Sequence, residues 1–315
     1  MAVPFKGMAG LWRISTLIWQ SKQTSKDGRL DSDHGVPSTA AYLWNPRTGD
    51  RLPLPNIHEE HDVVLMSKCS LTHKDPSHPG CVVVLLLLLF KDQGIMPHMC
   101  FCRISGGTPW RCLPYKIPSL LGVPRFITVI AACRGKLYFI SSRESMGAIH
   151  FPSNQDEDPV FQFFDAPRIN FVCPHGTSLG GWTWLVESPD NNLFLIYTCY
   201  DWDSRSKSNF LVAIHAYKMD FSTHAWHRVR DIGDAVVFLD RGYSRIAASC
   251  AASPLGLKGS HIYLFDHRKS DDDASYYLCA FDLGLDTLED IWVAPQSIID
   301  ALRGRQPFWI VPPTT

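Results

Sequence analysis

The sequence predicts an all-β fold built from repeated antiparallel units. A short apolar or aromatic strand, a turn rich in Asn, Asp, Gly or Thr, and a second strand recur from residue 41 onward. The turns at Asn45, Arg103, Asp165, Asp220 and Asp282 follow one another at intervals of 55 to 62 residues. Helical periodicity is nearly absent. Repeats of this length with several strands each are typical of a kelch-like β-propeller.

Five copies of the unit are visible, and between them lie further apolar strands. The five copies occupy residues 41–55, 100–114, 160–172, 216–229 and 279–292. The intervening strands are predicted at residues 82–90, 135–140, 191–198 and 259–266. Residues 82–90 are apolar without alternation, which predicts a strand covered on both faces. A helix is predicted only at residues 296–303.

Closure of the ring predicts six blades. The sixth blade is expected to join N-terminal strands to the C-terminal residues 308–313, since closure removes exposed sheet edges. Residues 1–40 are predicted to be an irregular N-terminal segment, and residues 41–315 to be the propeller domain. Large aromatic side chains recur in the units, and they serve either packing between blades or a ring of binding sites. They are Trp44, Trp110, Trp226 and Trp292.

Charge and cysteine usage limit the partners and the compartment. The formal net charge is -1, so no cluster of cations predicts binding to nucleic acid or to an anionic membrane. The ten cysteines have irregular spacings and do not predict a disulfide framework. Cys100 and Cys102 share one strand face, and they are either core residues or, with Cys112, soft-metal or oxidant-reactive thiols. We expect a protein of a reducing compartment, the cytoplasm or the nucleus.

Two motifs resemble chemical sites without the required context. Cys69, His73, His78 and Cys81 are the ligand types of tetrahedral zinc, but their spacing fits neither usual knuckle, which favours a solvated loop. Residues 176–180 match G-x-S-x-G, but a strand rather than a helix is predicted after them, so the doubled glycine indicates a turn. We therefore predict no catalytic residue, no cofactor and no metal site.

A charged loop with a central aromatic residue is the best candidate for partner binding. Asp201, Trp202 and Arg205 lie between two apolar strands. Propellers bind through loops of this kind, although an exposed hairpin tip without a role has the same composition.

Several ordered segments together resemble a known family. They are AYLWNPRTGDRLPLP at residues 41–55, WRCLPYKIP at 110–118, GKLYFI at 135–140, WHRVRDIGDAVVFL at 226–239, SPLGLKGSHIY at 253–263, FDLGLDTL at 281–288 and FWIVP at 308–312. This set resembles the KIB-type β-propeller of plant F-box-associated proteins, over residues 41–313.

The resemblance implies a kelch-like propeller that recognises another protein. In many relatives an upstream F-box recruits a ubiquitin-ligase core through a Skp-type adaptor. Residues 1–40 lack the Leu-Pro-x-Asp/Glu-Leu start of an F-box. The chain is therefore either an F-box-less member or one whose upstream portion is missing, and no F-box is predicted here to hold the adaptor.

Three functions remain open from the sequence. The first is a non-catalytic protein-recognition propeller, related to the substrate-binding components of SCF-type ubiquitin ligases. The second is a propeller hydrolase, which needs acid and base carboxylates that converge at the channel. The third is a degenerate F-box-less copy without a defined partner. The first is the prediction that we carry forward.

Overall fold

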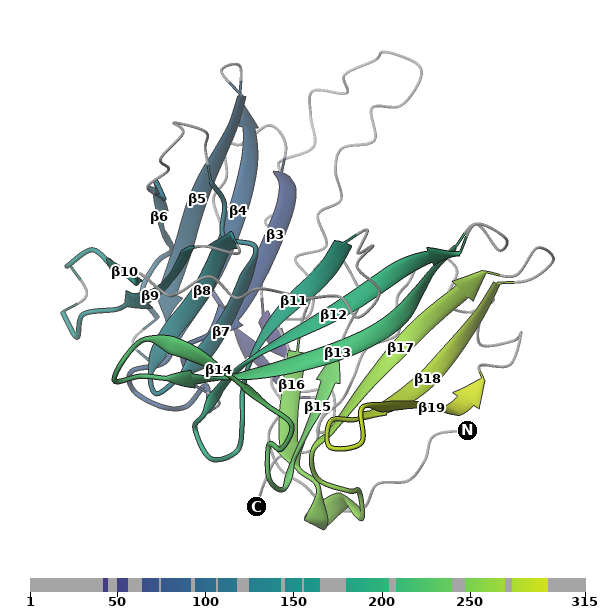
Figure 1. Ribbon diagram of the computed structural model, residues 1–315. Helices are drawn as coiled ribbons and strands as arrows, with labels where there is room; N and C mark the ends of the chain where they lie inside the picture. Colours follow the sequence, from purple (N-terminus) through teal and green to yellow (C-terminus); the bar gives the residue numbers. More distant parts are fainter. Residues whose placement is uncertain are drawn as a thin grey trace. The chain divides into compact units, whose positions relative to one another are not determined.

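The computed structural model is built of antiparallel sheets (Figure 1). It describes residues 42–44, 50–55, 64–73, 75–91, 94–105, 107–117, 125–142, 145–154, 156–164, 180–203, 208–239, 247–269 and 274–293. Helical structure within these ranges is limited to one 3-10 turn, Ser253–Leu255. The all-β prediction is thus confirmed, while the helix predicted at 296–303 lies outside the described residues.

The chain divides into two compact units, which are described separately. One unit comprises residues 10–126, and the other comprises residues 1–9 and 127–315. Neither unit has, among its described residues, a helix that is long and apolar enough to cross a membrane.

The unit of residues 10–126 contains a hairpin and one four-stranded sheet. The hairpin consists of β1 (Tyr42–Trp44) and β2 (Arg51–Pro53). The sheet, called sheet 1, has the order β3 (Val64–Leu71), β4 (Val82–Lys91), β5 (Gly94–Arg103) and β6 (Arg111–Pro114). Residues 82–87 of β4 are all buried, as is Leu89, so the prediction of a strand covered on both faces is confirmed.

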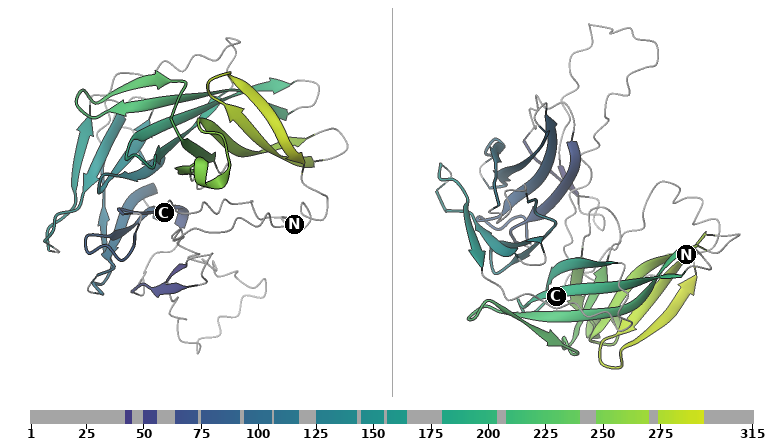
Figure 2. Two further views of the ribbon diagram at one scale, coloured as in Figure 1. Left: turned by 90° about the horizontal axis from the view of Figure 1, so that it is seen from below. Right: turned by 45° about the horizontal axis from the view of Figure 1, so that its top comes forward.

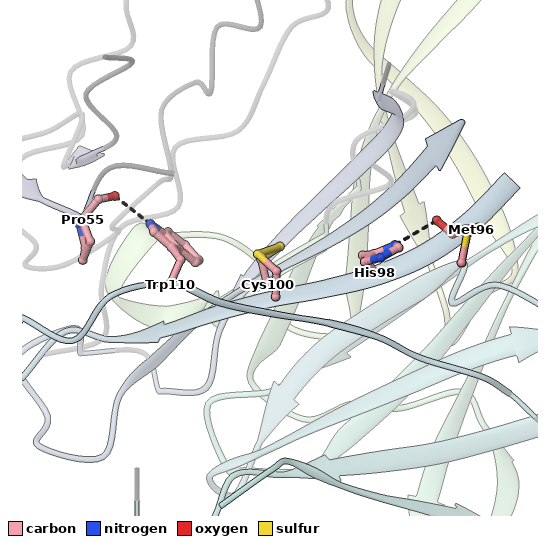
Figure 3. The surroundings of a disulfide bond; sticks show 6 residues. Pro55, Met96, His98, Cys100 and Trp110 are labelled. Atoms are coloured by element: carbon pink, nitrogen blue, oxygen red, sulfur yellow. Dashed lines mark hydrogen bonds between the residues drawn. A yellow bond between two sulfur atoms is a disulfide. The ribbon is translucent and has the colours of Figure 1, made fainter. Parts of the chain in front are cut away.

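Hydrophobic packing joins the hairpin to sheet 1. Leu43 and Leu54 from the hairpin segment share a core with Val83 and Cys102 of sheet 1, and Trp110 packs against this core. The indole Nε1 of Trp110 also donates a hydrogen bond of 2.7 Å to the carbonyl of Pro55 (Figure 3).

The unit of residues 127–315 contains three further sheets, which follow one another in chain order (Figures 1 and 2). Sheet 2 has the order β7 (Val129–Cys133), β8 (Lys136–Ser142), β9 (Ser145–His150) and β10 (Val160–Phe164). Sheet 3 has the order β11 (Gly180–Glu187), β12 (Leu193–Asp203), β13 (Ser208–Asp220) and β14 (Ala225–Val229).

Sheet 4 has five strands and one exception to the antiparallel rule. Its order is β16 (Ala247–Ala251), β15 (Ala235–Leu239), β17 (His261–Lys269), β18 (Ala274–Asp282) and β19 (Thr287–Val293). β15 and β17 run parallel because the connection through β16 and the 3-10 turn intervenes between them. The strands predicted at 135–140, 191–198 and 259–266 correspond to β8, β12 and β17.

Two continuous cores fill the spaces between sheets 2, 3 and 4. One joins residues such as Tyr138 and Ile140 of sheet 2 to Leu195 and Tyr197 of sheet 3. The other core joins sheet 3 to sheet 4 and contains the fully buried Trp184. The strands of these sheets carry apolar side chains on both faces, and packing the sheets face to face buries those side chains.

Polar contacts supplement the cores at one point. The carboxylate of Glu187, the last residue of β11, accepts a hydrogen bond of 3.3 Å from the backbone N–H of Arg134 in sheet 2. The carbonyl of Glu187 accepts another from the hydroxyl of Ser249 in sheet 4. Arg134 further donates from Nε to the carbonyl of Asn191 and lies over the ring of Phe221. Glu187 is therefore shared by three consecutive sheets.

Three of the five copies of the repeated unit are the outer hairpins of sheets 1, 3 and 4. The turns at Arg103, Asp220 and Asp282 connect β5 to β6, β13 to β14 and β18 to β19. In each, the residue four positions later has a left-handed backbone: Gly107, His224 and Asp286 have φ values of 59°, 54° and 58°. The turns at Asp220 and Asp282 have the same length, since Asp220 pairs with Ala225 and Asp282 with Thr287, while the connection from Arg103 to Arg111 is longer.

The third copy was placed wrongly by the sequence pattern. Residues 160–164 form β10, which is the outer strand and not the third strand of sheet 2. The equivalent turn therefore lies between His150 and Val160, upstream of Asp165. The aromatic composition of β10 is also typical of a strand in the middle of a sheet. In the structure, this outer strand is aromatic because Phe161 packs against Phe139 of the same sheet.

The described residues do not show the predicted six blades. They form four sheets of four or five strands, together with the β1–β2 hairpin. The residues 308–313 that were expected to close a sixth blade lie outside the described part of the chain, as do residues 1–40. The sixth blade therefore stays a prediction, while four blade-like sheets are shown by the described residues.

Candidate functional site

The predicted partner-binding residues lie at the end of the longest hairpin in the described structure. Asp201 and Trp202 belong to β12, in which Asp201 pairs with Phe210 and Trp202 with Asn209 of β13. Arg205 lies outside the described residues. Asp201 is half-buried. Asp201 and Trp202 therefore lie within a strand and not in the predicted loop, and the structure does not test their contact with a partner.

This hairpin extends beyond the other strands of its sheet as far as those strands are described. β11 pairs with β12 only as far as Tyr200, and β14 pairs with β13 only from Ala216 to Asp220. A β-bulge between Cys199 and Tyr200 changes the register where the extension begins. Bulges of this kind commonly redirect a strand near functional sites. Residues 201–203 and 208–210 therefore form a two-stranded ribbon that no other described strand flanks.

Phe210 adds an apolar contact to this ribbon and was not selected from the sequence. Its side chain is 40% exposed, although it lies in the apolar strand β13. The sequence signal was weak, because Phe210 follows a polar loop and continues directly into buried residues such as Leu211. Only the register of the ribbon shows that Phe210 lies opposite Asp201.

The Cys/His motif is held by local hydrogen bonds at the β3–β4 turn. The rings of His73 and His78 stack with centroids 3.9 Å apart. Nδ1 of His78 accepts a hydrogen bond from the N–H of Gly80, and the thiol of Cys81 donates to the carbonyl of His73. Among the residues that the structure describes, no group of three or more His, Cys, Asp or Glu is arranged to hold a metal ion.

The doubled glycine of the G-x-S-x-G motif is part of a strand and not of a turn, so that prediction is wrong. Gly180 and Gly181 begin β11 and pair with Tyr200 and Cys199. A side chain at Gly181 would overlap the ring of the buried Tyr197. Glycine occurs here because a neighbouring aromatic ring covers the backbone.

The carboxylates with perturbed pKa values act as hydrogen-bond acceptors in turns. Hydrogen bonds from Ser222, and then from Thr223, lower the pKa of Asp220 to about 2. The hydroxyl of Ser260 lowers the pKa of Asp231, and backbone N–H groups of the turn lower that of Asp282. A glycosidase-type general acid instead requires a raised pKa.

The segments that carry most of the family resemblance interlock with one another. Asp231 accepts hydrogen bonds from the N–H of Gly233 at 2.7 Å and from the hydroxyl of Ser260 at 2.6 Å. The same hydroxyl accepts from the N–H of Ile232 at 3.0 Å. A side chain at Gly259 would overlap the carbonyl of Gly233. These segments therefore fix the start of sheet 4 and are structural in character.

A second contact in this region joins Asp234 to Ser253. The carboxylate of Asp234 accepts from both the N–H and the hydroxyl of Ser253, at 3.0 and 2.6 Å. Pro254 follows in the 3-10 turn, and Gly256 ends it with a φ of 65°. The motif residues DIGD and SPLGLKG thus hold the connection that makes β15 and β17 parallel.

The recurring tryptophans serve packing where their side chains are described, with one exception. Trp110 and Trp226 are half-buried and pack against cores of their own units. Trp292 lies on the outer strand β19 and is 39% exposed. The side chain of Trp44 lies outside the described part of the chain.

One cysteine pair departs from the expectation of free thiols. Cys100 of β5 and Cys112 of β6 are directly opposite in the register and form a disulfide (Figure 3). The sequence could not predict this bond because it depends on strand register. Cys102, on the same face of β5, is a buried free thiol, so its assignment to the core is confirmed.

Comparison with known proteins identifies a family. Residues 25–282 match the model of the KIB1-4 beta-propeller family. No curated protein is matched by the chain. One similar solved structure is an S. cerevisiae assembly of Dbp5 bound to Nup159, Gle1, IP6 and ADP, with 9% sequence identity and a TM-score of 0.31. The match covers 78% of this chain and 53% of the chain in that structure. A likeness of this strength carries no argument about function.

Proposed function

The chain belongs to the KIB1-4 beta-propeller family, and from that premise we propose that it is a non-catalytic domain that recognises another protein. The observation that carries the proposal is the projecting ribbon of β12 and β13. Within the described part of the chain, residues 201–203 and 208–210 extend past the strands that flank the rest of sheet 3. Loops and hairpins presented by a rigid β-scaffold are common binding elements.

The partner contact is assigned to Asp201, Trp202, Arg205 and Phe210. An exposed aromatic ring provides apolar contact area, and charged neighbours provide orientation.

The bound protein is proposed to be a substrate that is held for an SCF-type ubiquitin ligase, in the cytoplasm or the nucleus. This finer proposal rests on the family resemblance alone. Residues 1–40 lack the Leu-Pro-x-Asp/Glu-Leu start of an F-box, so they add no support for a link to the Skp-type adaptor.

Affinity purification of the tagged chain from its own cells tests both the recognition proposal and the ubiquitin-ligase proposal. We expect a specific protein to co-purify with the wild type and to be lost with Phe210→Ala. The matched control is Leu285→Ala, which removes a side chain that is 74% exposed on a turn of sheet 4. The recognition proposal fails if both variants retain the same partners as the wild type.

The composition of the purified complex decides whether the chain is a component of an SCF-type ubiquitin ligase. Recovery of a Skp-type adaptor and a cullin supports a ligase component. A partner that depends on Phe210 but comes without adaptor or cullin supports an independent binding domain and removes the ubiquitin proposal.

A further inference from the structure

The two cysteines of the Cys100–Cys112 disulfide differ strongly in their exposure to solvent. Cys100 lies in the central strand β5 and is 0% exposed. Cys112 lies in the edge strand β6, which pairs only with β5 among the described strands, and Cys112 is exposed. A thiolate attacks a disulfide along a path that needs access to one sulfur. Cys112 is therefore the half of the disulfide that lies nearer to a reagent from solvent.

The neighbouring cysteines of sheet 1 are poor internal attackers. Cys69 lies in the same row of the sheet, across Leu85 from Cys100. Burial raises the pKa of the Cys69 thiol well above its usual range, and burial raises the pKa of Cys102 to about 12. Both remain protonated at neutral pH, and only the thiolate is an effective nucleophile. An exchanging thiolate must therefore come from solvent.

We propose that Cys112 is a thiol–disulfide exchange site for small-molecule thiols of the glutathione class. The inference rests on the exposure of Cys112, the burial of Cys100 and the register that joins them. It goes beyond the recognition function and does not depend on it.

The exchange proceeds in two balanced steps. A thiolate RS⁻ attacks Cys112 Sγ, a bond forms between the two sulfurs, and the Cys112–Cys100 bond breaks. The electron pair of that bond leaves with Cys100 Sγ, which takes up the proton that RSH gave up when it formed RS⁻. A second RS⁻ can then attack the sulfur of the bound RS group, which releases RSSR and the Cys112 thiolate. Two small thiols are oxidised and one protein disulfide is reduced.

The structural consequence concerns the β1–β2 hairpin. β6 has four residues, and the disulfide is its covalent link to β5. Trp110 lies two residues before Cys112, donates to the carbonyl of Pro55 and packs against Leu43 and Leu54. Opening the disulfide removes the covalent restraint next to this contact. The redox state thus controls how firmly the hairpin is attached to sheet 1.

The test equilibrates the native full-length chain with defined ratios of reduced and oxidised glutathione. Samples are quenched with an alkylating reagent and mapped by mass spectrometry. We expect a glutathione adduct on Cys112, with Cys100 recovered as an alkylated thiol after denaturation, and full reduction at high reduced glutathione. Amide hydrogen exchange of residues 111–113 should become faster when the disulfide opens.

Cys102 and Cys112→Ser provide the controls. Cys102 is buried on the same strand as Cys100, so it should stay unmodified in the native chain. In Cys112→Ser, no adduct should form on Cys100, and the amide exchange of residues 111–113 should no longer respond to glutathione.

Three results would overturn the proposal. The disulfide could resist glutathione until the chain is denatured. The adduct could form on Cys100 instead of Cys112. Alternatively, both cysteines could remain free thiols even with an excess of oxidised glutathione. Because none of these readouts involves a partner protein, loss of the recognition function would leave the result unchanged.

Discussion

The side chains that distinguish this sequence act mainly as hydrogen-bond partners in turns. Asp220 and Asp282 each accept the N–H two residues later, at 2.8 Å in both cases. Asp231 does the same within its own loop and also binds Ser260, which is distant in the sequence. Short acidic side chains fit this role because they can reach the backbone of a tight turn.

Ser260→Ala should destabilise the protein more than an equivalent change in a local turn. The hydroxyl of Ser260 donates to Asp231 and accepts from the N–H of Ile232, so both partners lose a contact. We expect a decrease of about 1–2 kcal/mol in the free energy of unfolding, measured by urea denaturation. Ser222→Ala is the control, since Ser222 contacts only Asp220, two residues away. Equal losses in the two variants would contradict the proposed interlock.

The turn carboxylates predict a loss of stability in acid. Their pKa values are lower in the folded chain than in the unfolded chain, so the folded state favours the ionised form. The stability that they contribute is complete above the unfolded pKa of about 3.9 and is lost as the pH falls through the folded value. For Asp220 that folded value is about 2.

Urea denaturation at a series of pH values tests this dependence. The free energy of unfolding should fall between about pH 4 and pH 2 for the wild type. Asp220→Asn should show a smaller fall over this range, because its side chain no longer titrates. An identical acid dependence in the variant would rule out a contribution from Asp220.

The hairpins of this fold depend on glycines where large aromatic rings cross a neighbouring strand. Phe139 of β8 lies over Gly147 of β9, and Tyr197 of β12 lies over Gly181 of β11. Both aromatic residues are almost completely buried. The ring fills the space that a side chain would need, so the strand remains regular while the core stays closely packed.

Gly181→Ala should therefore strain sheet 3. The new methyl group would overlap the ring of Tyr197, which cannot move freely because it is buried. We expect a loss of about 1–3 kcal/mol in the free energy of unfolding and a lower melting temperature in a thermal scan. Gly284→Ala is the control, because its nearest neighbour is Oδ1 of Asp282 at 3.3 Å on an exposed turn. A variant as stable as wild type would show that Tyr197 can be displaced.

Three sheets of the unit of residues 127–315 are joined through one residue of an inner strand. The side chain of Glu187 contacts Arg134 of sheet 2, while its carbonyl contacts Ser249 of sheet 4. The two contacts use different atoms of Glu187, but both require the end of β11 to hold one position. Residues that share a partner are expected to be coupled energetically.

A double-mutant cycle on Glu187→Ala and Ser249→Ala tests this coupling. We expect the double variant to differ from the sum of the single variants by about 0.5 kcal/mol or more in the free energy of unfolding. The control pair is Ser249→Ala with Ser222→Ala, because Ser222 lies on the outer turn of sheet 3 and shares no contact with Ser249. Additive losses in both pairs would show that the three sheets are joined independently.

The sequence by itself determined the all-β class, the repeated outer hairpin and the family. These features are local: alternation, turn residues and motif order depend on neighbours along the chain. For this reason the turns at Arg103, Asp220 and Asp282 and the doubly covered strand β4 were predicted correctly. The copy at Asp165 failed because an aromatic outer strand has the same local composition as an inner one.

Only the tertiary structure decided which residues meet across strands and sheets. Register places Cys100 opposite Cys112, brings Phe210 opposite Asp201 and sets the ring of Tyr197 over Gly181. A shift of one residue would turn each of these side chains to the other face of its sheet. The composition of one strand does not specify that register, because it is set jointly by the turn geometry and by the packing of whole strands against one another.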